Sequence, residues 1–599
     1  MAGGRRLPGA WLSGVAAASF LVAVAPACHR SRLLPRADGA AVVLVTSPDS
    51  GGAEPGVLAL SETEPNGALA TAQKVDLGAG SAVTISGSIA PAGPGPAAKG
   101  RDVDLYRLVV PAEADAGAAP AGTGSRPVDR PVDRPVDRPV DRPVDGAAGS
   151  RPSSRRRLSA LVHPDLGLPI SVEALDDAGQ SLVAAVGGQP GEVEGIPSLT
   201  VTPGTYFLKV RAAQAGAEGG YRLTVRLLPV EVGEESEPNG KSSLAGDLSP
   251  TGEAVGYFGW RKDQDWYRVP LDGLAEGSVL SADLEAVPGV TASLLVFDSV
   301  ERKLMEVRGR KEERVALRNI RLPAGEPHLF LQVRAEAGRN VEVRYNLRVR
   351  TEVAKPGGAG GDLEPNDDAA HASPLADGTV QGYLGRGDID VYRYSAAEPL
   401  ELDIEAAPPE RVDLKMEIIR EPDGLLLVRS DLGRRHEPER LANVYVAPGS
   451  VLIRLYAARE DGNADEPYRL TVSSRQPQPG AEREPNGTVA SAMPLVGGTA
   501  GNGLLFPRGD VDFWQAPVAP DGEGNVAITA SGIAGLAIDL RVMTLANNNR
   551  EVGHFKISGD APVTNRLTVG GEACCLLQVK EATGKAANFR DRYTVTVGR

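Results

Sequence analysis

Apolar and polar residues alternate along most of this chain. Val290, Ala292, Leu294 and Val296 fall on one side of an extended backbone, with mostly small or polar residues between them. A period of two is typical of a strand with one buried face. Gly and Pro are abundant, and no long helical periodicity follows the first 30 residues. The pattern predicts an all-β chain of short strands joined by many turns.

One strand pattern, Tyr-x-Leu-x-Val, recurs four times along the chain. Each copy follows two strands joined by a Pro or Gly turn. The four copies span 221–225, 345–349, 468–472 and 593–597, the last with Val595 at the Leu position, and the preceding strand pairs span 199–210, 322–333, 444–455 and 567–579. A recurring set of short alternating strands predicts a tandem array of four β-sandwich, jelly-roll-like domains.

An acidic signature in two halves recurs with the same period. The first half is an acid, any residue, then Glu-Pro-Asn, and the second is Asp-x-Asp before an aromatic strand. Its members are Glu62, Glu64, Asn66, Asp102 and Asp104; Glu235, Glu237, Asn239, Asp263 and Asp265; Asp362, Glu364, Asn366, Asp388 and Asp390; and Glu482, Glu484, Asn486, Asp510 and Asp512. Alternate side chains of an extended chain share one side, so each half presents two carboxylates together.

These repeats and the Pro/Gly-rich segments between them predict the domain organisation. We expect a signal peptide at 1–27, a flexible tether at 28–58, and sandwich domains at 59–230, 231–355, 356–476 and 477–599. An insert at 111–157 interrupts the first domain and contains five copies of Arg-Pro-Val-Asp. Regular prolines prevent a helix and remove donors from a strand, so we expect a disordered surface loop. A Pro-rich ligand for a partner is the alternative.

The acidic signature and the closing Tyr-x-Leu-x-Val strand together resemble the bacterial pre-peptidase C-terminal (PPC) domain. That β-sandwich module is appended to many secreted proteases, and its relatives include the collagen-binding domains of clostridial collagenases. The resemblance covers nearly all of the chain beyond residue 60. It implies a noncatalytic module with affinity for an extracellular protein or polysaccharide. It also implies a calcium site formed by the first acidic pair, the Asn, the acid after it and the Asp-x-Asp turn.

The residues themselves are compatible with calcium. That ion takes six to eight oxygen ligands, which the two acidic halves and the Asn can supply if they converge. The alternative is that Asp caps turns and Glu faces solvent. Only the third copy has an acid directly after the Asn, Asp367, with Asp368 behind it; Gly67, Gly240 and Gly487 occupy that position elsewhere. The third copy is therefore expected to offer the most ligands.

The N-terminal segment predicts export. Arg5 and Arg6 precede a mostly apolar run at 11–24, and small residues lead to Cys28. This order is typical of a signal peptide. Cys28 directly after Ala27 resembles a bacterial lipoprotein box, which implies a lipid anchor and an outer-membrane or cell-surface location. Simple cleavage after Ala27 and secretion explain the same residues.

The other cysteines do not suggest a disulfide framework. The chain has 3 Cys, and Cys574 and Cys575 are adjacent in a predicted strand, at positions expected to face opposite sides. We interpret them as buried free cysteines. A vicinal disulfide or a metal site is the alternative.

The distribution of charge and the absence of catalytic motifs argue against nucleic-acid binding and against catalysis. A net charge of −14 spread over both signs argues against nucleic acid as a partner. The 6 His are isolated, and His436-Glu437 lacks the second histidine of a zinc protease because Arg440 stands in its place. We therefore expect no enzyme activity, and a cell-surface protein that binds an extracellular polymer. A purely structural spacer and a noncatalytic partner of a secreted protease are the alternatives.

Overall fold

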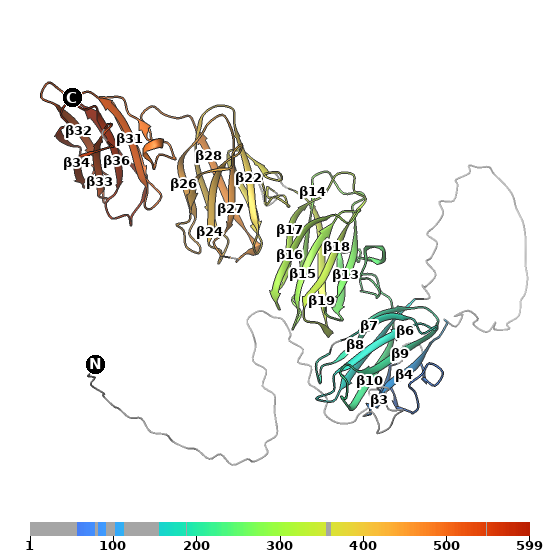
Figure 1. Cartoon of the computed structure of the whole chain (residues 1–599). Coiled ribbons are helices and arrows are strands. Elements are labelled where there is room, and N and C mark those ends of the chain that lie inside the picture. Colours follow the sequence, from blue (N-terminus) through green and yellow to red (C-terminus); the bar gives the residue numbers. More distant parts are fainter. Residues whose placement is uncertain are drawn as a thin grey trace, which may run out of the picture. The chain divides into compact units, whose positions relative to one another are not determined.

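Strands make up nearly all of the ordered structure. The computed structural model describes residues 57–77, 82–90, 102–112, 155–186, 188–354, 361–459, 461–546 and 548–599. Apart from two short 3-10 helices, the elements of this part are all strands (Figure 1), which confirms the all-β prediction. In the same part of the chain, no helix is long and apolar enough to cross a membrane. The signal peptide, Cys28 and most of the tether and insert lie outside the described residues.

The first module consists of two five-stranded sheets. Their orders are β1-β3-β10-β5-β8 and β2-β4-β9-β6-β7. The strands are β1 (Val57–Ser61), β2 (Gln73–Asp76), β3 (Ala82–Ile89), β4 (Val103–Val110), β5 (Arg156–Pro164), β6 (Ile170–Leu175), β7 (Ser181–Ala185), β8 (Glu194–Val201), β9 (Gly204–Ala212) and β10 (Gly219–Pro229). β1 starts just before the predicted end of the tether, and β5 starts just before the predicted end of the insert.

The second module has one five-stranded sheet, β11-β13-β18-β15-β16, and one four-stranded sheet, β12-β19-β14-β17. Its elements are η1 (Ser242–Leu244), β11 (Gly246–Asp247), β12 (Glu253–Phe258), β13 (Gln264–Pro270), β14 (Ser278–Leu284), β15 (Thr291–Phe297), β16 (Lys303–Lys311), β17 (Val315–Arg321), β18 (His328–Ala337) and β19 (Asn340–Val353). The alternating residues Ala292, Leu294 and Val296 belong to β15, as their pattern predicts.

The third module repeats this arrangement as β20-β22-β27-β24-β25 and β21-β28-β23-β26. Its strands are β20 (Ser373–Leu375), β21 (Gly378–Leu384), β22 (Ile389–Ala396), β23 (Leu400–Ala407), β24 (Leu414–Arg420), β25 (Leu425–Ser430), β26 (Glu439–Val446), β27 (Gly449–Ala457) and β28 (Asn463–Arg475).

The fourth module follows the same orders, β29-β31-β36-β33-β34 and β30-β37-β32-β35. Its elements are η2 (Val489–Ser491), β29 (Met493–Pro494), β30 (Ala500–Leu505), β31 (Val511–Val518), β32 (Asn525–Ser531), β33 (Ile538–Thr544), β34 (Glu551–Ile557), β35 (Val563–Thr568), β36 (Cys574–Glu581) and β37 (Asn588–Gly598).

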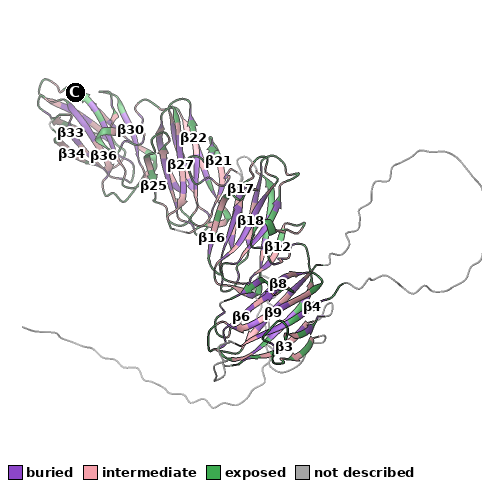
Figure 2. Cartoon of the chain, turned by 45° about the vertical axis from the view of Figure 1, so that its right-hand side comes forward, coloured by how far each residue is buried: buried purple, intermediate pink, exposed green. Residues whose placement is uncertain are grey.

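Each module buries its own apolar core between its two sheets (Figure 2). The strands that carry the Tyr-x-Leu-x-Val pattern, β10, β19, β28 and β37, lie inside a sheet, and their apolar residues face this core. The strand that contains the second Asp of each Asp-x-Asp, namely β4, β13, β22 or β31, lies in the opposite sheet. The two sequence patterns therefore meet across the core, which positions the acidic residues.

Cys574 and Cys575 lie in the fourth core and are fully buried, as expected for β36. Their sulfur atoms are joined in a disulfide. The interpretation as free cysteines pointing to opposite faces is therefore wrong, and the vicinal disulfide, the alternative, is the arrangement found.

Candidate metal centres

The two halves of the acidic signature converge in all four modules. One carboxylate oxygen from each member of a cluster lies within 4.8 Å of the others. The first cluster is Glu62, Glu64 and Asp104; the second is Glu235, Glu237 and Asp265; the third is Asp362, Glu364 and Asp390; and the fourth is Glu482, Glu484, Asp510 and Asp512. The segment that ends in Pro-Asn thus folds back against the Asp-x-Asp strand, as a shared cation site requires.

Backbone N–H groups orient the first acidic pair. In the third module, the Tyr383 N–H donates to Asp362 Oδ2 at 2.9 Å, and the Asn366 N–H donates to Glu364 Oε2 at 3.0 Å. The same two contacts recur in the other modules, from Ser88, Tyr257 and Leu504 to the first acid and from Asn66, Asn239 and Asn486 to the second. Each contact holds one oxygen of its carboxylate. In the first and third modules the other oxygen of the first acid accepts from the side-chain amide of Asn66 or Asn366, at 2.8 and 2.6 Å.

The two aspartates of Asp-x-Asp have different roles. The first one caps the turn: Asp388 accepts from the N–H of Gly385 at 2.8 Å and from that of Ile389 at 3.1 Å. Asp263 and Asp510 accept in the same way, and Asp102 accepts from the Ala90 N–H at 2.6 Å. Turn capping, the alternative to metal binding, therefore holds for the first Asp, although Asp510 also belongs to the fourth cluster.

In the first, second and fourth modules, a tyrosine hydroxyl of the closing strand donates a hydrogen bond to the second Asp. The Tyr345 hydroxyl of β19 donates to Asp265 Oδ2 at 2.8 Å and shares a 2.6 Å hydrogen bond with the Tyr267 hydroxyl of β13. The first module repeats this with Tyr221, Tyr106 and Asp104. In the fourth module, Tyr593 donates to Asp512 and accepts from the indole N–H of Trp514. One carboxylate oxygen is thereby bound to the core, and Oδ1 faces the cluster.

A glycine lets this tyrosine approach the cluster. A Cβ on Gly256 would lie 2.3 Å from the Tyr345 hydroxyl oxygen and 2.7 Å from Glu235 Oε2. Gly87, Gly382 and Gly503 have equivalent neighbours, since a Cβ there would lie 2.4–2.6 Å from the hydroxyl oxygen of Tyr221, Tyr468 or Tyr593. In the second to fourth modules the strand pairing shifts register after this glycine. Pairing starts again two residues later, and the residue between is left unpaired. The bulge turns the intervening N–H toward the first acid.

Buried oxygens remain without a donor in every cluster. Among the described residues, no hydrogen-bond partner exists for these side-chain oxygens: Asn66 Oδ1 and Asp104 Oδ1; Glu237 Oε1, Asn239 Oδ1 and Asp265 Oδ1; Glu364 Oε1, Asn366 Oδ1, Asp390 Oδ1 and Asp390 Oδ2; and Glu482 Oε1, Glu484 Oε1, Asn486 Oδ1 and Asp512 Oδ1. All of these residues are buried. Leaving buried acceptors unpaired is costly, and a cation is the partner that satisfies several acceptors at once.

Burial and mutual repulsion strongly raise the pKa values of the acids. Burial raises the pKa of Asp265 to about 7. Burial, with repulsion from Asp265, raises the pKa of Glu237 to about 8. In the fourth cluster, burial and the nearby Glu484 raise the pKa of Asp512 to about 8. These raised pKa values indicate that the clusters hold more negative charge than the protein alone can stabilise.

The structure does not bring every predicted ligand into place. Asp367 and Asp368 of the third module are exposed, and neither belongs to the third cluster. Four acids meet in the fourth cluster and three in the third, so the largest acidic set is not in the third module. In the first cluster, Glu64 is exposed, whereas its counterparts Glu237, Glu364 and Glu484 are buried.

The glycine and the tyrosine were not predicted as parts of the site. Both leave a signal in the sequence, because a Gly lies between the two acidic halves in every copy and a Tyr opens every closing strand. The alternating pattern by itself indicates only that the tyrosine belongs to a strand.

The chain is similar to solved β structures only at a distance. No protein-family model and no curated protein matches it. One similar structure is a CUB1-EGF-CUB2 domain of human MASP-1/3, with 11% identity, covering 37% of this chain and 99% of that chain, at a TM-score of 0.14. Another is the CBM22-1-CBM22-2 tandem domain of Paenibacillus barcinonensis Xyn10C, with 13% identity, 34% and 79% coverage, and a TM-score of 0.13. A biofilm-associated protein BSP domain has 9% identity, 75% and 90% coverage, and a TM-score of 0.11.

Proposed function

We propose that this chain is a noncatalytic array of calcium-binding β-sandwich modules that binds an extracellular protein or polysaccharide. We further propose that it is exported and held at the cell surface by a lipid on Cys28. The observation that carries the proposal is the fourfold convergence of buried oxygens that lack a donor. The resemblance to PPC domains points in the same direction.

The donor set favours calcium over other cations. The clusters contain carboxylates and an Asn carbonyl but no histidine or cysteine, which zinc and copper prefer. Magnesium demands a small octahedral shell and keeps several waters. Calcium accepts irregular shells of carboxylate and carbonyl oxygens, and in extracellular modules it binds with a Kd of roughly 10⁻⁴ to 10⁻³ M.

A structural role suits these clusters better than a catalytic one. The same set of acids is built four times and is buried in three of the modules. A reaction needs one accessible site with a group that meets the substrate. We infer that the cations stabilise the modules and that any ligand binds elsewhere on them.

A groove lined by residues of the third and fourth modules offers a surface for the polymer. Phe589 of β37 is 42% exposed and lies 5.7 Å from the ring of Phe506. The guanidinium of Arg440 stacks over Phe589 at 5.0 Å, and Asn443 and Arg592 line the same groove of about 340 Å³. An exposed aromatic ring beside hydrogen-bonding side chains is suited to sugar rings and to peptides.

Titration of calcium into the chelated full-length protein tests the central claim. We expect saturable binding at millimolar calcium or below, with a gain in melting temperature because the ion binds the folded state alone. Asp512→Asn should remove one site and lower the stoichiometry by one. Binding without any loss in this variant, or no binding at all, would contradict the proposal.

Cosedimentation with insoluble polysaccharide and with fibrous collagen tests the polymer claim. Phe589→Ala should reduce the fraction retained on one of these polymers, whereas Leu166→Ala, which removes a 98% exposed side chain on the first module, should not. Equal retention of both variants would exclude the groove. Loss of detergent partitioning in Cys28→Ala would support the lipid anchor.

A further inference from the structure

Three of the four acidic segments are hydrogen-bonded to the module that precedes them. The Glu237 N–H donates to Ser198 O at 2.9 Å, and the Thr200 N–H donates to Glu237 O at 2.9 Å. Glu364 makes the same pair of bonds with Asn319 O and the Arg321 N–H, at 3.0 and 2.8 Å. Glu484 makes them with Asn443 O and the Tyr445 N–H, at 2.8 Å each. The Glu that precedes Pro-Asn in each of these signatures thus forms a short parallel bridge to the edge strand β8, β17 or β26 of the preceding module.

The receiving edges share a local irregularity. The pairing of β8, β17 and β26 with the neighbouring strand shifts register next to Ser198, Asn319 and Asn443, the residues whose carbonyls accept the bond. The corresponding edge strand of the fourth module, β35, pairs with β32 without any shift. The bulge therefore marks the edges that receive a following module. β35 serves as an internal control.

One residue connects the two modules to the cluster. The backbone of Glu364 is bonded to β17 of the second module, while its Oε2 accepts from the Asn366 N–H and its Oε1 faces the third cluster. Glu237 and Glu484 are placed identically. The position of the acid in the cluster and the docking of its backbone on the edge strand cannot change independently.

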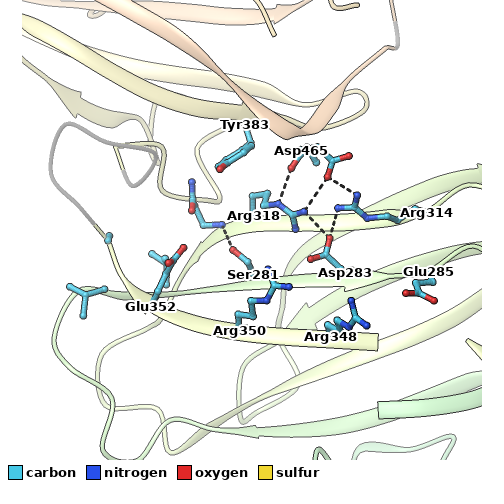
Figure 3. Close-up of a pocket in the computed structure, with 15 residues that line it drawn as sticks. Ser281, Asp283, Glu285, Arg314, Arg318, Arg348, Arg350, Glu352, Tyr383 and Asp465 are labelled. Carbon is cyan, nitrogen blue, oxygen red and sulfur yellow. Dashed lines mark hydrogen bonds and ion pairs between the residues drawn. The ribbon is translucent and has the colours of Figure 1, made fainter. Parts of the chain in front are cut away.

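Ion pairs surround this contact at each junction. Arg157 meets Glu234 at 2.9 Å, Arg314 meets Asp465 at 2.5 Å, and Arg483 lies 3.6 Å from Glu401. Figure 3 shows the second of these junctions, where Arg314 and Arg318 of the second module point at Asp283 and at Asp465 of the third. The Arg318 Nε also donates to the Ala464 carbonyl at 2.8 Å.

We propose that calcium in the second, third and fourth clusters locks each module onto the edge strand of its predecessor. The proposal rests on the calcium binding proposed above. Without the cation, carboxylates with unpaired oxygens repel one another and push the segment out of place. With the cation, the acid is held, and its backbone stays in the bulge of the preceding module. Calcium binding and junction docking are then coupled reciprocally.

Hydrogen exchange on the full-length protein tests this coupling. The readouts are the amides of Thr200, Arg321 and Tyr445, each of which belongs to the module before the cluster that governs it. We expect calcium to slow their exchange by about tenfold or more, equivalent to about 1.4 kcal/mol and within the usual range of coupling energies. The outward-facing amides of β35, which contact no module in the described part of the chain, should not respond.

Asp390→Asn gives the decisive comparison because the substitution and its readout lie in different modules. It should abolish the calcium response of the Arg321 amide and leave those of Thr200 and Tyr445 intact. Glu364→Gln, which keeps the backbone contact, is the second variant should the first lose the fold of the third module. If calorimetry shows calcium binding while all three amides exchange unchanged, the junction proposal is wrong and calcium binding stands. If calorimetry shows no calcium binding, both proposals fall.

Discussion

The first and fourth clusters are built from the same motif, yet their second acids lie in different surroundings. Glu484 is 7% exposed and is hydrogen-bonded to β26 of the third module, whereas Glu64 is exposed and makes no such bond within the described residues. Asp512 and Asp104, by contrast, are buried alike and are held by the same tyrosine. The comparison separates two contributions to the site. The closing strand of the module itself binds the second Asp through its tyrosine, and we call this contact the base of the site. In the fourth module, β26 of the preceding module also contacts the second acid, Glu484, and we call this contact the cover.

The contact with a preceding module explains why the fourth cluster has more buried oxygens without a donor than the first. In the first cluster, the buried oxygens that lack a donor belong to Asn66 and Asp104. In the fourth cluster, oxygens of Glu482 and Glu484 lack a donor in addition to those of the Asn and the second Asp. Covering an acid removes water that would otherwise solvate it. The modules that receive a predecessor therefore depend more on a cation than the first module does.

Removing calcium at high pH should lower the free energy of unfolding more than any other change considered below. Burial raises the pKa of Asp265 and Asp512 to about 7 and 8, far above the value of about 4 for an unfolded aspartate. The folded protein then binds more protons than the unfolded chain between about pH 4 and pH 8, so the free energy of unfolding falls as pH rises through this window. A pKa that differs by one between the folded and unfolded chain corresponds to about 1.4 kcal/mol, so the loss amounts to several kcal/mol.

Thermal unfolding with and without a chelator at pH 5 and pH 9 measures this loss. Calcium replaces the protons, so the decline with pH should be strong in the chelator and small in saturating calcium. Burial also raises the pKa of Asp104 in the first module, to about 9, so that module should lose protection too. Module-resolved hydrogen exchange should show a larger loss in the second and fourth modules, where the second acid is buried as well. A calcium-free melting temperature that rises with pH would show that the pKa values of these acids are not raised in the folded protein.

Much of the fold and half of the site follow from local patterns. Alternation predicts the strands, and Glu-x-Glu and Asp-x-Asp predict paired carboxylates, because both depend only on neighbouring residues. The pattern also pairs Asp102 with Asp104 and Asp388 with Asp390 as equal ligands. In the structure Asp388 caps a turn, and Asp102 accepts from the Ala90 N–H. Which aspartate faces the cluster depends on the turn geometry, and two carboxylates spaced alike do not reveal it.

The remaining features depend on contacts distant in sequence. The hydroxyl of Tyr345 reaches Asp265 across the sandwich, and Glu364 is buried by β17 of another module. The exposure of Asp367 likewise follows from the path of the chain after Pro-Asn. Cys574 and Cys575 illustrate the same limit, since strand alternation places their side chains apart and the folded backbone brings the sulfur atoms together.

The tyrosine that binds the second Asp in the first and fourth clusters gives a smaller effect, which should be the same in these two modules. A Cβ on Gly503 would lie 2.5 Å from the Tyr593 hydroxyl oxygen and 2.7 Å from Glu482 Oε2, and a Cβ on Gly87 would lie 2.5 Å from Cζ of Tyr221. Because these tyrosines are buried, they have little room to move. Gly503→Ala and Gly87→Ala should each lower the free energy of unfolding by about 1–3 kcal/mol, as overpacked cores do.

Gly522→Ala is the matched control for Gly503→Ala, because a Cβ there meets nothing within 4 Å and the substitution lies in the same module. It should change stability by less than about 0.5 kcal/mol, as surface substitutions usually do. Denaturant unfolding measures all three variants, and calcium titration of Gly503→Ala should show weaker binding because the displaced tyrosine no longer holds Asp512. If Gly87→Ala proved harmless while Gly503→Ala did not, the base would not be common to the two clusters. The contrast between the first and fourth modules would then extend beyond the cover that a preceding module provides.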